Sequence, residues 1–142
     1  MAGTRTLTII KPDALGAAKA GRIIAHLEQA GFRVRAARVL HLSTAQAESF
    51  YEVHKERPFY RSLVTFMTQG PCMPMVLERQ NAVAELRSVI GSTDPMEAAD
   101  GTVRKLYAVS KESNAIHASD SDENAIRESN FFFAETELLG VK

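Results

Sequence analysis

His117 is the residue of this sequence best placed for nucleophilic chemistry. It lies inside the short apolar run Ala115–Ala118, directly before Ser119–Glu123, a segment rich in helix N-cap residues and first-turn acids. A neutral imidazole is a good nucleophile toward phosphorus, and a helix N-terminus beside it would offer N–H groups to phosphate oxygens. The pattern is therefore compatible with phosphoryl transfer, although a lone histidine in an apolar run is more often a core residue.

Three basic residues could supply an anion site for such a nucleophile. Lys11 directly follows an apolar, β-branched segment, so its ammonium would lie at one rim of a sheet; a solvated lysine at a strand end is the alternative. Arg87 lies on the polar side of a predicted helix and Arg104 in a long loop, and each by itself is compatible with full exposure. The sequence has no Gly-x-x-x-x-Gly-Lys-Ser/Thr loop and no Gly-x-Gly-x-x-Gly motif, so any nucleotide would bind without these phosphate loops.

The elements that would position these residues alternate between strands and helices. β-Branched and alternating apolar residues predict strands at Thr6–Ile10, Phe32–Leu42 with a bulge near Ala37, Pro74–Glu78 and Ala115–Ala118. Helical spacing predicts helices over Ala20–Ala30, from the capping box Ser43–Gln46 to about Lys55, after Phe59, over Ala82–Ile90, and finally through Ala125 and Phe132. This order predicts an α/β protein of the α+β kind, with a ferredoxin-like βαββαβ fold in which helices cover one face of a four-stranded antiparallel sheet.

Two connections are predicted to lack regular structure. Lys11–Asp13 is expected to be a polar loop, because proline lacks an N–H donor and disfavours helix at the preceding residue. The segment from Gly91 to Asn114 has only a short apolar patch at Leu106–Val109. A loop of this length in so short a chain is usually functional or disordered, and its polar residues favour function.

Composition limits the classes of protein that fit. A chain of 142 residues with 45% hydrophobic residues predicts a single domain, 1–142. Seventeen basic and seventeen acidic residues balance, so bulk charge gives no reason to expect binding to nucleic acid or to a membrane. The apolar runs are too short for a membrane span or a signal peptide, which predicts a cytoplasmic protein. The four histidines and the single Cys72 have no second ligand at metal-binding spacing, so no protein-bound metal is expected, and Cys72 is interpreted as a small core residue.

Five short motifs together resemble nucleoside diphosphate kinase of the bacterial type, over nearly the whole chain. They are Thr8-Ile-Ile-Lys11-Pro12-Asp13-Ala14, Phe50-Tyr51-x-x-His54-x-x-x-Pro58-Phe59, Arg87-x-x-x-Gly91-x-Thr93-Asp94-Pro95, Gly101-Thr102-x-Arg104 and Asn114-x-x-His117-x-Ser119-Asp120. The resemblance implies a ping-pong reaction in which a nucleoside triphosphate, mainly ATP, phosphorylates His117. The phosphohistidine then transfers the group to a nucleoside diphosphate, which maintains the NTP and dNTP pools.

The resemblance also implies roles for individual residues. The nucleotide site would be lined by Lys11, Tyr51, Arg87, Thr93, Arg104 and Asn114. Phe59 would stack on the base, and stacking without groups that read the base edge implies broad base specificity. Glu128 would orient the imidazole of His117 by accepting from its other ring nitrogen, with Ser119 in support. Mg²⁺ would be held by the nucleotide phosphates and water, with Asp120 in its outer shell. The family further implies a homo-oligomer, with a tetramer favoured over a hexamer or a dimer.

One departure from the family pattern and one different class of protein stay open at this point. Ala118 stands where the family usually has glycine, and a backbone with positive φ there would strain the added methyl group. A catalytically silent family member is the corresponding alternative. Arg33, Arg35 and Arg38 could form the basic face of a nucleic-acid-binding module, but the aromatic signature of an RNA-binding sheet is missing.

Overall fold

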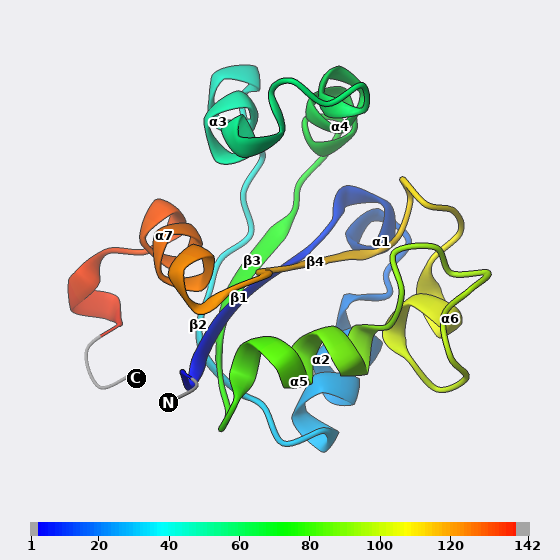
Figure 1. Cartoon of the computed structure of the whole chain (residues 1–142), viewed down its shortest axis with the longest axis vertical. Helices are drawn as coiled ribbons and strands as arrows, with labels where there is room; N and C mark the ends of the chain where they lie inside the picture. Colours follow the sequence, from blue (N-terminus) through cyan, green and yellow to red (C-terminus); the bar gives the residue numbers. More distant parts are fainter. Residues whose placement is uncertain (1–2, 139–142) are drawn as a thin grey trace.

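The computed structural model describes residues 3–138 (Figure 1). Its elements, in chain order, are β1 (Arg5–Ile10), α1 (Pro12–Gly16), α2 (Ala20–Gln29), β2 (Arg33–Ala37), α3 (Thr44–Phe50), η1 (Glu52–His54), α4 (Tyr60–Met67), β3 (Met73–Glu78), α5 (Ala82–Ile90), α6 (Val103–Tyr107), β4 (Ile116–Ala118), α7 (Asp122–Phe132) and η2 (Glu135–Glu137). None of the helices in this part of the chain is long and apolar enough to cross a membrane.

The strands of residues 3–138 form one four-stranded sheet in the order β2-β3-β1-β4. All three pairings are antiparallel, and β4 pairs with β1 through only three residue pairs, Thr8↔Ala118, Ile9↔His117 and Ile10↔Ile116. This is the predicted ferredoxin-like arrangement. The short β4 forms one edge of the sheet, so the residues after Ala118 are free to turn into a new helix.

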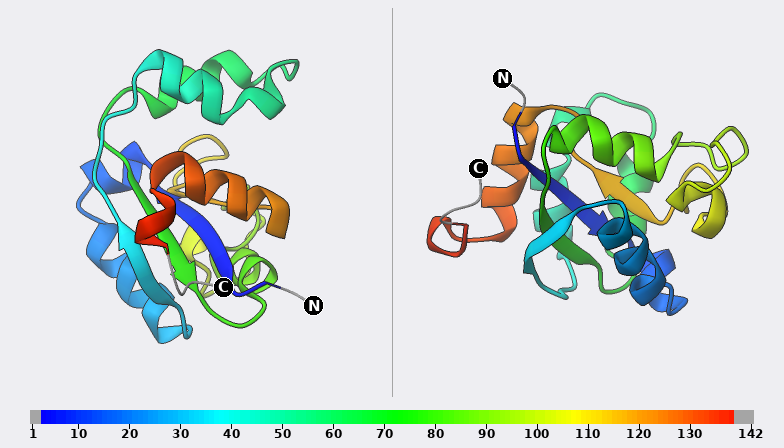
Figure 2. Two further views of the ribbon diagram at one scale, coloured as in Figure 1. Left: turned by 90° about the vertical axis from the view of Figure 1, so that its left-hand side faces the viewer. Right: turned by 90° about the horizontal axis from the view of Figure 1, so that it is seen from below.

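Helices cover both faces of the sheet, and the expectation of one covered face is wrong. On one face α3, α4 and α7 pack on Leu7 and Ile9; on the other, α2 and α5 pack on Ile10 and Leu77 (Figures 1 and 2). The physical reason lies in β1, where from Thr6 to Ile10 the side chains on both faces are apolar or are threonines, and all of them are buried. A strand of this composition must be covered on each side, because its buried side chains alternate between the two faces.

Three local predictions also need correction. The expected loop at Lys11–Asp13 is the start of helix α1, because proline is tolerated at the first helical position, where its missing N–H would be unpaired anyway. Strand β2 ends at Ala37, and its bulge falls between Val34 and Ala36, earlier than expected. The capping box of Ser43 and Gln46 is present, but α3 ends at Phe50 and a 3-10 turn follows.

The segment between α5 and β4 contains the short helix α6, which the sequence did not predict. Its start is fixed by Thr102, whose side chain donates to Ala99 O (2.7 Å) and accepts from Lys105 N (3.3 Å). Thr102 packs tightly against Gly91, the residue that ends α5 with φ +88°. This contact holds the segment to the end of α5.

We expect Gly91→Ala to destabilise the protein by about 2 kcal/mol or more, because a Cβ at this left-handed position would lie 2.6 Å from Thr102 Oγ1. Gly21→Ala is the matched control: a Cβ in this helix meets nothing within 4 Å, and alanine should stabilise α2 by up to about 1 kcal/mol. Urea unfolding of both variants is the measurement. An unchanged midpoint for Gly91→Ala would contradict the geometry.

Candidate active site

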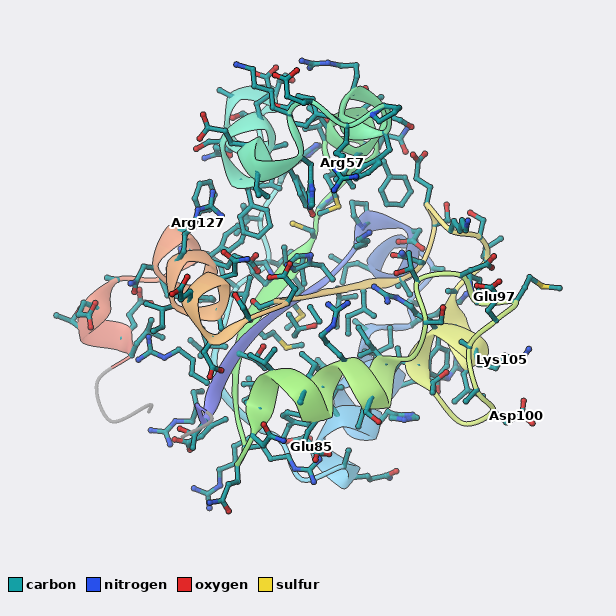
Figure 3. All side chains as sticks on the ribbon, in the orientation of Figure 1. Arg57, Glu85, Glu97, Asp100, Lys105 and Arg127 are labelled. Carbon is teal, nitrogen blue, oxygen red and sulfur yellow. The ribbon has the colours of Figure 1, made fainter. Side chains whose placement is uncertain are left out.

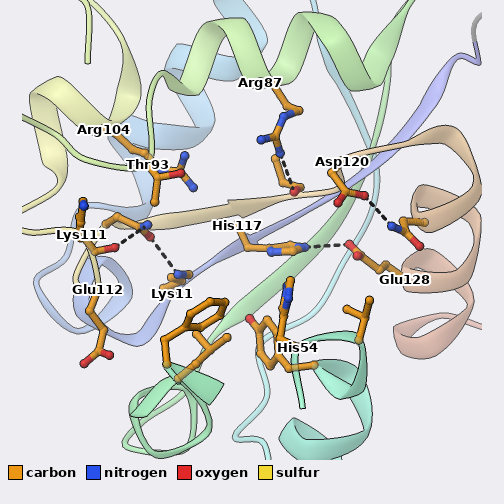
Figure 4. Close-up of a pocket in the computed structure, with 17 residues that line it drawn as sticks. Lys11, His54, Arg87, Thr93, Arg104, Lys111, Glu112, His117, Asp120 and Glu128 are labelled. Carbon is orange, nitrogen blue, oxygen red and sulfur yellow. Dashed lines mark hydrogen bonds and ion pairs between the residues drawn. The ribbon is translucent and has the colours of Figure 1, made fainter. Parts of the chain in front are cut away.

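A pocket of about 560 Å³ opens beside β4, where elements from both faces of the sheet meet (Figure 4). Side chains from Tyr51 at the end of α3, from η1 and from the start of α4 form one wall, and those from α5 and the segment before β4 form the other. The predicted site residues that line it are Lys11, Tyr51, Phe59, Arg87, Thr93, Arg104, Asn114, His117 and Glu128. Of the site residues predicted from the sequence, Ser119 alone is absent from the lining, since it is fully buried behind Glu128.

His117 lies at the centre of this pocket (Figure 4). Its backbone is fixed in β4 by pairing with Ile9 and by Thr8, whose hydroxyl donates to His117 O (2.7 Å). The ring makes edge contacts with Phe50 and Tyr51, at centroid distances of 5.4 Å and 6.1 Å. Packing on these rings limits rotation of the imidazole, so its nitrogens have defined directions.

The Glu128 carboxylate determines which nitrogen of His117 is available for chemistry. Glu128 Oε1 lies 2.7 Å from His117 Nε2 and also accepts from Ser119 Oγ at 2.7 Å. An ionised carboxylate only accepts hydrogen bonds, so Nε2 is the protonated nitrogen of the neutral ring. Nδ1 then carries the lone pair, and it is the nucleophilic atom that the pocket can use.

Lys11 and Asn114 form a buried pair at one side of His117. Lys11 Nζ donates to Asn114 Oδ1 (2.9 Å), and Asn114 Nδ2 donates to Lys111 O (2.9 Å). Lys11 is only 6% exposed. Burial, followed by the charge of Arg104, lowers the pKa of Lys11 to about 8, because little solvent remains to stabilise its ammonium form. A negatively charged ligand would supply the missing countercharge.

Arg104 and Arg87 approach His117 from the opposite wall. Arg104 is 8% exposed, donates to Gly91 O (3.1 Å) and Ile116 O (2.7 Å), and has an Nε with no hydrogen-bond partner within residues 3–138. Burial and the nearby charge of Arg87 lower the pKa of Arg104 to about 10. Arg87 donates weakly to Ala118 O (3.5 Å). No carboxylate of the described chain pairs with either arginine, so the wall is a cationic surface with Thr93 on it.

Aromatic residues define the other features of the pocket. The Tyr51 hydroxyl is buried and lacks a hydrogen-bond partner in the described structure, and burial raises the pKa of this phenol well above its usual range. Phe59 lies at the mouth, 47% exposed, against the His54 ring (centroids 5.4 Å apart). An exposed aromatic ring beside a pocket is a suitable stacking surface for a flat ligand.

The donor set does not favour a metal ion bound by protein side chains alone. Within residues 3–138, no group of three or more His, Cys, Asp or Glu side chains could hold one. Asp120 is the exposed carboxylate beside His117, and it accepts a hydrogen bond from Asn124. One carboxylate fits an ion whose other ligands come from phosphate oxygens and water.

The structure also brings residues to the pocket that sequence reasoning missed: Val53, His54, Leu63, Lys111, Glu112 and Asn124. Of these, only His54 carried a signal, since it belongs to one of the recognised motifs. Lys111 and Glu112 belong to a turn, and no pattern in the neighbouring sequence indicates that its side chains would reach the pocket. By contrast, Glu97, Asp100 and Lys105 of the neighbouring segment point outward into solvent (Figure 3).

The strain considered at Ala118 is absent, because the described non-glycine residues with positive φ are Ala18, Asn81 and Ala115. Ala118 lies in β4 and accommodates its methyl group without strain. Of the three arginines considered as a basic face, Arg35 on β2 pairs with Glu78 (2.9 Å) and Arg38 after β2 pairs with Glu137 (3.4 Å), while Arg33 is exposed.

Comparison with known proteins gives one consistent result. The family model described as nucleoside diphosphate kinase matches residues 4–138. The nucleoside diphosphate kinase of Chlorobium chlorochromatii is 58% identical over 135 residues, covering 95% of this chain and 96% of the relative. A crystal structure of the Aquifex aeolicus nucleoside diphosphate kinase superposes with a TM-score of 0.93 at 42% identity, covering 96% and 99% of the two chains. The structure of a halophilic nucleoside diphosphate kinase from Halobacterium salinarum in complex with CDP gives a TM-score of 0.90 at 33% identity, covering 95% and 90%.

Lys11 should make anion binding dependent on pH. Below its pKa of about 8 Lys11 is charged and attracts phosphate; as the pH rises through this value the charge is lost. The affinity for ADP, whose phosphates titrate near pH 6, is therefore expected to fall by roughly three- to tenfold between about pH 7 and 9.5.

Isothermal titration calorimetry across this range is the measurement. Lys11→Met should bind ADP more weakly than the wild type near pH 7 and lose most of the dependence, so that the two affinities converge toward about pH 9.5. Lys105→Met, an exposed lysine outside the pocket, should keep it. Equal pH dependence in wild type and Lys11→Met would contradict the assignment.

Proposed function

The chain belongs to the nucleoside diphosphate kinase family, and we propose that the pocket around His117 is where it carries out that family's reaction. The enzyme transfers the terminal phosphate of a nucleoside triphosphate to a nucleoside diphosphate, by a ping-pong mechanism with a phosphohistidine intermediate. The main observation in support is the fixed imidazole of His117. Its Nε2 is held by Glu128, and the buried cations Lys11 and Arg104 lie near it.

In the first half-reaction, His117 Nδ1 attacks the γ-phosphorus of the donor. The N–P bond forms as the bond from phosphorus to the bridging oxygen breaks, and the nucleoside diphosphate leaves. The charge that develops on the ring is stabilised by Glu128 through the Nε2–H donor, and Ser119 keeps the carboxylate in place. In the second half-reaction, a terminal oxygen of the acceptor attacks the same phosphorus and the N–P bond breaks.

Cationic groups provide most of the remaining catalysis, because phosphoryl transfer needs alignment and charge stabilisation more than covalent assistance. In this proposal Arg87, Arg104 and Thr93 bind the phosphates. Lys11 and Asn114, which are already hydrogen bonded to each other, bind ribose and phosphate. The Tyr51 hydroxyl has no hydrogen-bond partner within the described residues. In the complex it would donate to an oxygen of the phosphates or of the ribose.

The base would stack on Phe59 at the pocket mouth. The CDP complex of the Halobacterium salinarum relative supports a nucleotide in this fold, and the exposed ring of Phe59 supports the orientation with the base outward and the phosphates inward. Stacking by itself accepts every base, since each has a π-face.

We further propose ATP as the main donor, with Mg²⁺ bound to its phosphates. The ion would neutralise phosphate charge and hold the phosphate chain in one conformation. Asp120, steadied by Asn124, would contact it through water.

Three properties of the whole protein belong to the same proposal: a single catalytic domain over residues 1–142, a cytoplasmic location, and a homo-oligomer, with a tetramer favoured over a hexamer or a dimer. Exposed apolar side chains support self-association, since Met96, Leu106 and Val109 are 82%, 54% and 75% exposed within one segment. The buried cations Lys11 and Arg104 face the pocket, and Arg35 and Arg38 are paired with acids, so the structure gives no support to nucleic acid as a partner.

Incubation with γ-labelled ATP and Mg²⁺ should label the protein in a form that is stable in alkali and labile in acid, as a phosphoramidate is. Addition of GDP should transfer the label to GTP. His117→Ala should abolish both steps, while His41→Ala, whose ring contacts the Thr68 carbonyl away from the pocket, should retain them. Label that persists in His117→Ala at the wild-type rate would refute the assignment.

Glu128→Gln should lower kcat by roughly ten- to a hundredfold with little change in KM, because Glu128 acts on the imidazole and touches no part of the nucleotide in this proposal. Ser119→Ala should have a smaller effect in the same direction. Glu123→Gln, an exposed acid on the same helix, is the control. Steady-state kinetics with varied acceptor separates the two constants, and a rise in KM alone would argue against a positioning role.

A further inference from the structure

The turn before Asn114 places an acidic side chain at the mouth of the pocket. Val109 N donates to Ser113 O (2.8 Å), and Ser113 N donates to Ser110 Oγ (3.1 Å), which closes the turn. The same turn supplies the Lys111 carbonyl that fixes Asn114. Glu112 lies in this turn, so the hydrogen bond between Lys111 and Asn114 ties its position to Asn114, the residue proposed to bind ribose.

The Glu112 carboxylate is held in place from the opposite wall. Ser62, on α4, donates a hydrogen bond to Glu112 Oε2. Only Oε2 takes part in this bond, so Oε1 remains as an acceptor. Because Glu112 also lines the pocket, its carboxylate is an oriented, charged acceptor at the mouth.

Glu112 lies at the mouth of the pocket, across from helix α4. Figure 4 places it on the opposite side of His117 from Asp120 and Glu128. The Lys11–Asn114 pair lies near this side of His117, and Phe59 and Leu63 line the same pocket from α4 and the residue before it. A base stacked on Phe59 would thus present its edge near the turn that carries Glu112.

A carboxylate is an unexpected group in a pocket for a polyanion, since it repels phosphate. Ser62 and the nearby charge of Lys11 offset part of that cost within the chain. Any further contact of Oε1 must come from a hydrogen-bond donor, because an ionised carboxylate cannot itself donate. Among the common bases, guanine alone presents two adjacent donors, N1–H and the 2-amino group. Adenine and cytosine place one amino donor beside an acceptor nitrogen, which a carboxylate would repel.

We propose that Glu112 is a specificity-determining residue that binds the N1–H and 2-amino edge of guanine, so that guanine nucleotides are favoured at this site. The inference rests on the proposed stacking of the base on Phe59. It adds one group that reads the base edge to the proposed stacking.

The test compares GDP with IDP as acceptors of phosphate from isolated, labelled phosphoenzyme in single-turnover experiments. The two differ only in the 2-amino group, so stacking and phosphate contacts are shared. For the wild type we expect kcat/KM for GDP to exceed that for IDP by roughly three- to tenfold, the range for one charge-assisted hydrogen bond in a partly exposed site. Glu112→Gln should bring the ratio close to one.

Three further variants make the result specific. Ser62→Ala should reduce the ratio partly, because the carboxylate loses its orientation. Phe59→Leu should lower kcat/KM for both acceptors and reduce the ratio partly, because the base loses the stacking that holds its edge near Glu112. Glu97→Gln, an exposed acid of the neighbouring segment, should leave the ratio at the wild-type value.

Equal values for GDP and IDP in the wild type, or an unchanged ratio in Glu112→Gln, would overturn the inference and leave the phosphotransferase function intact. Failure of the phosphoenzyme to transfer label to either acceptor would instead contradict the proposed function.

Discussion

The contact between His117 Nε2 and Glu128 Oε1 is the constraint on which the site depends. It joins the edge strand β4 to helix α7, and the same carboxylate oxygen accepts from the buried Ser119 hydroxyl. Since β4 pairs with β1 over only three residue pairs, the strand alone would fix the direction of the imidazole poorly. The hydrogen bond to α7 and the rings of Phe50 and Tyr51 supply the missing restraint, and they leave Nδ1 as the reactive nitrogen.

The cations around this imidazole work against the stability of the free protein. Lys11 and Arg104 are almost fully buried, no carboxylate of the described chain pairs with them, and their pKa values are lowered chiefly by burial. In the proposed reaction, the phosphates of the nucleotide would supply the countercharge that these two side chains lack. The same arrangement therefore favours phosphate binding in the ground state and charge stabilisation during transfer, because groups fixed in advance need no reorganisation.

The position of the pocket follows from the covering of both sheet faces. Elements on the face of α3 and α4 supply Tyr51 and Phe59, and on the other side α5 supplies Arg87 and α6 supplies Arg104. The side chains from the two faces can meet beyond β4, because β4 is the edge strand and no further strand of the described chain separates the two faces there. The bond between Ser62 and Glu112 connects the walls again at the mouth.

Much of the fold was determined by local sequence. Alternating apolar residues, the capping box at Ser43 and the glycine at the end of α5 gave the strands, two helix boundaries and the antiparallel topology. The resemblance to the family likewise identified His117, Lys11 and Arg104, because the family's motifs have these residue types at these spacings. Helix α1 and the second covered face were missed, since proline at N1 and a doubly buried strand produce no distinctive period.

Only the tertiary structure decided how these residues act together. Glu128 and Ser119 are nine residues apart, Lys11 and Asn114 are 103 apart, and Ser62 and Glu112 are 50 apart, so no local pattern could pair them. Burial also arises only on folding: it lowers the pKa of Lys11 and leaves the Tyr51 hydroxyl without a partner among the described residues. The sequence by itself determined which side chains were available, whereas the packing of distant elements decided their charge, their direction and the ligand they can hold.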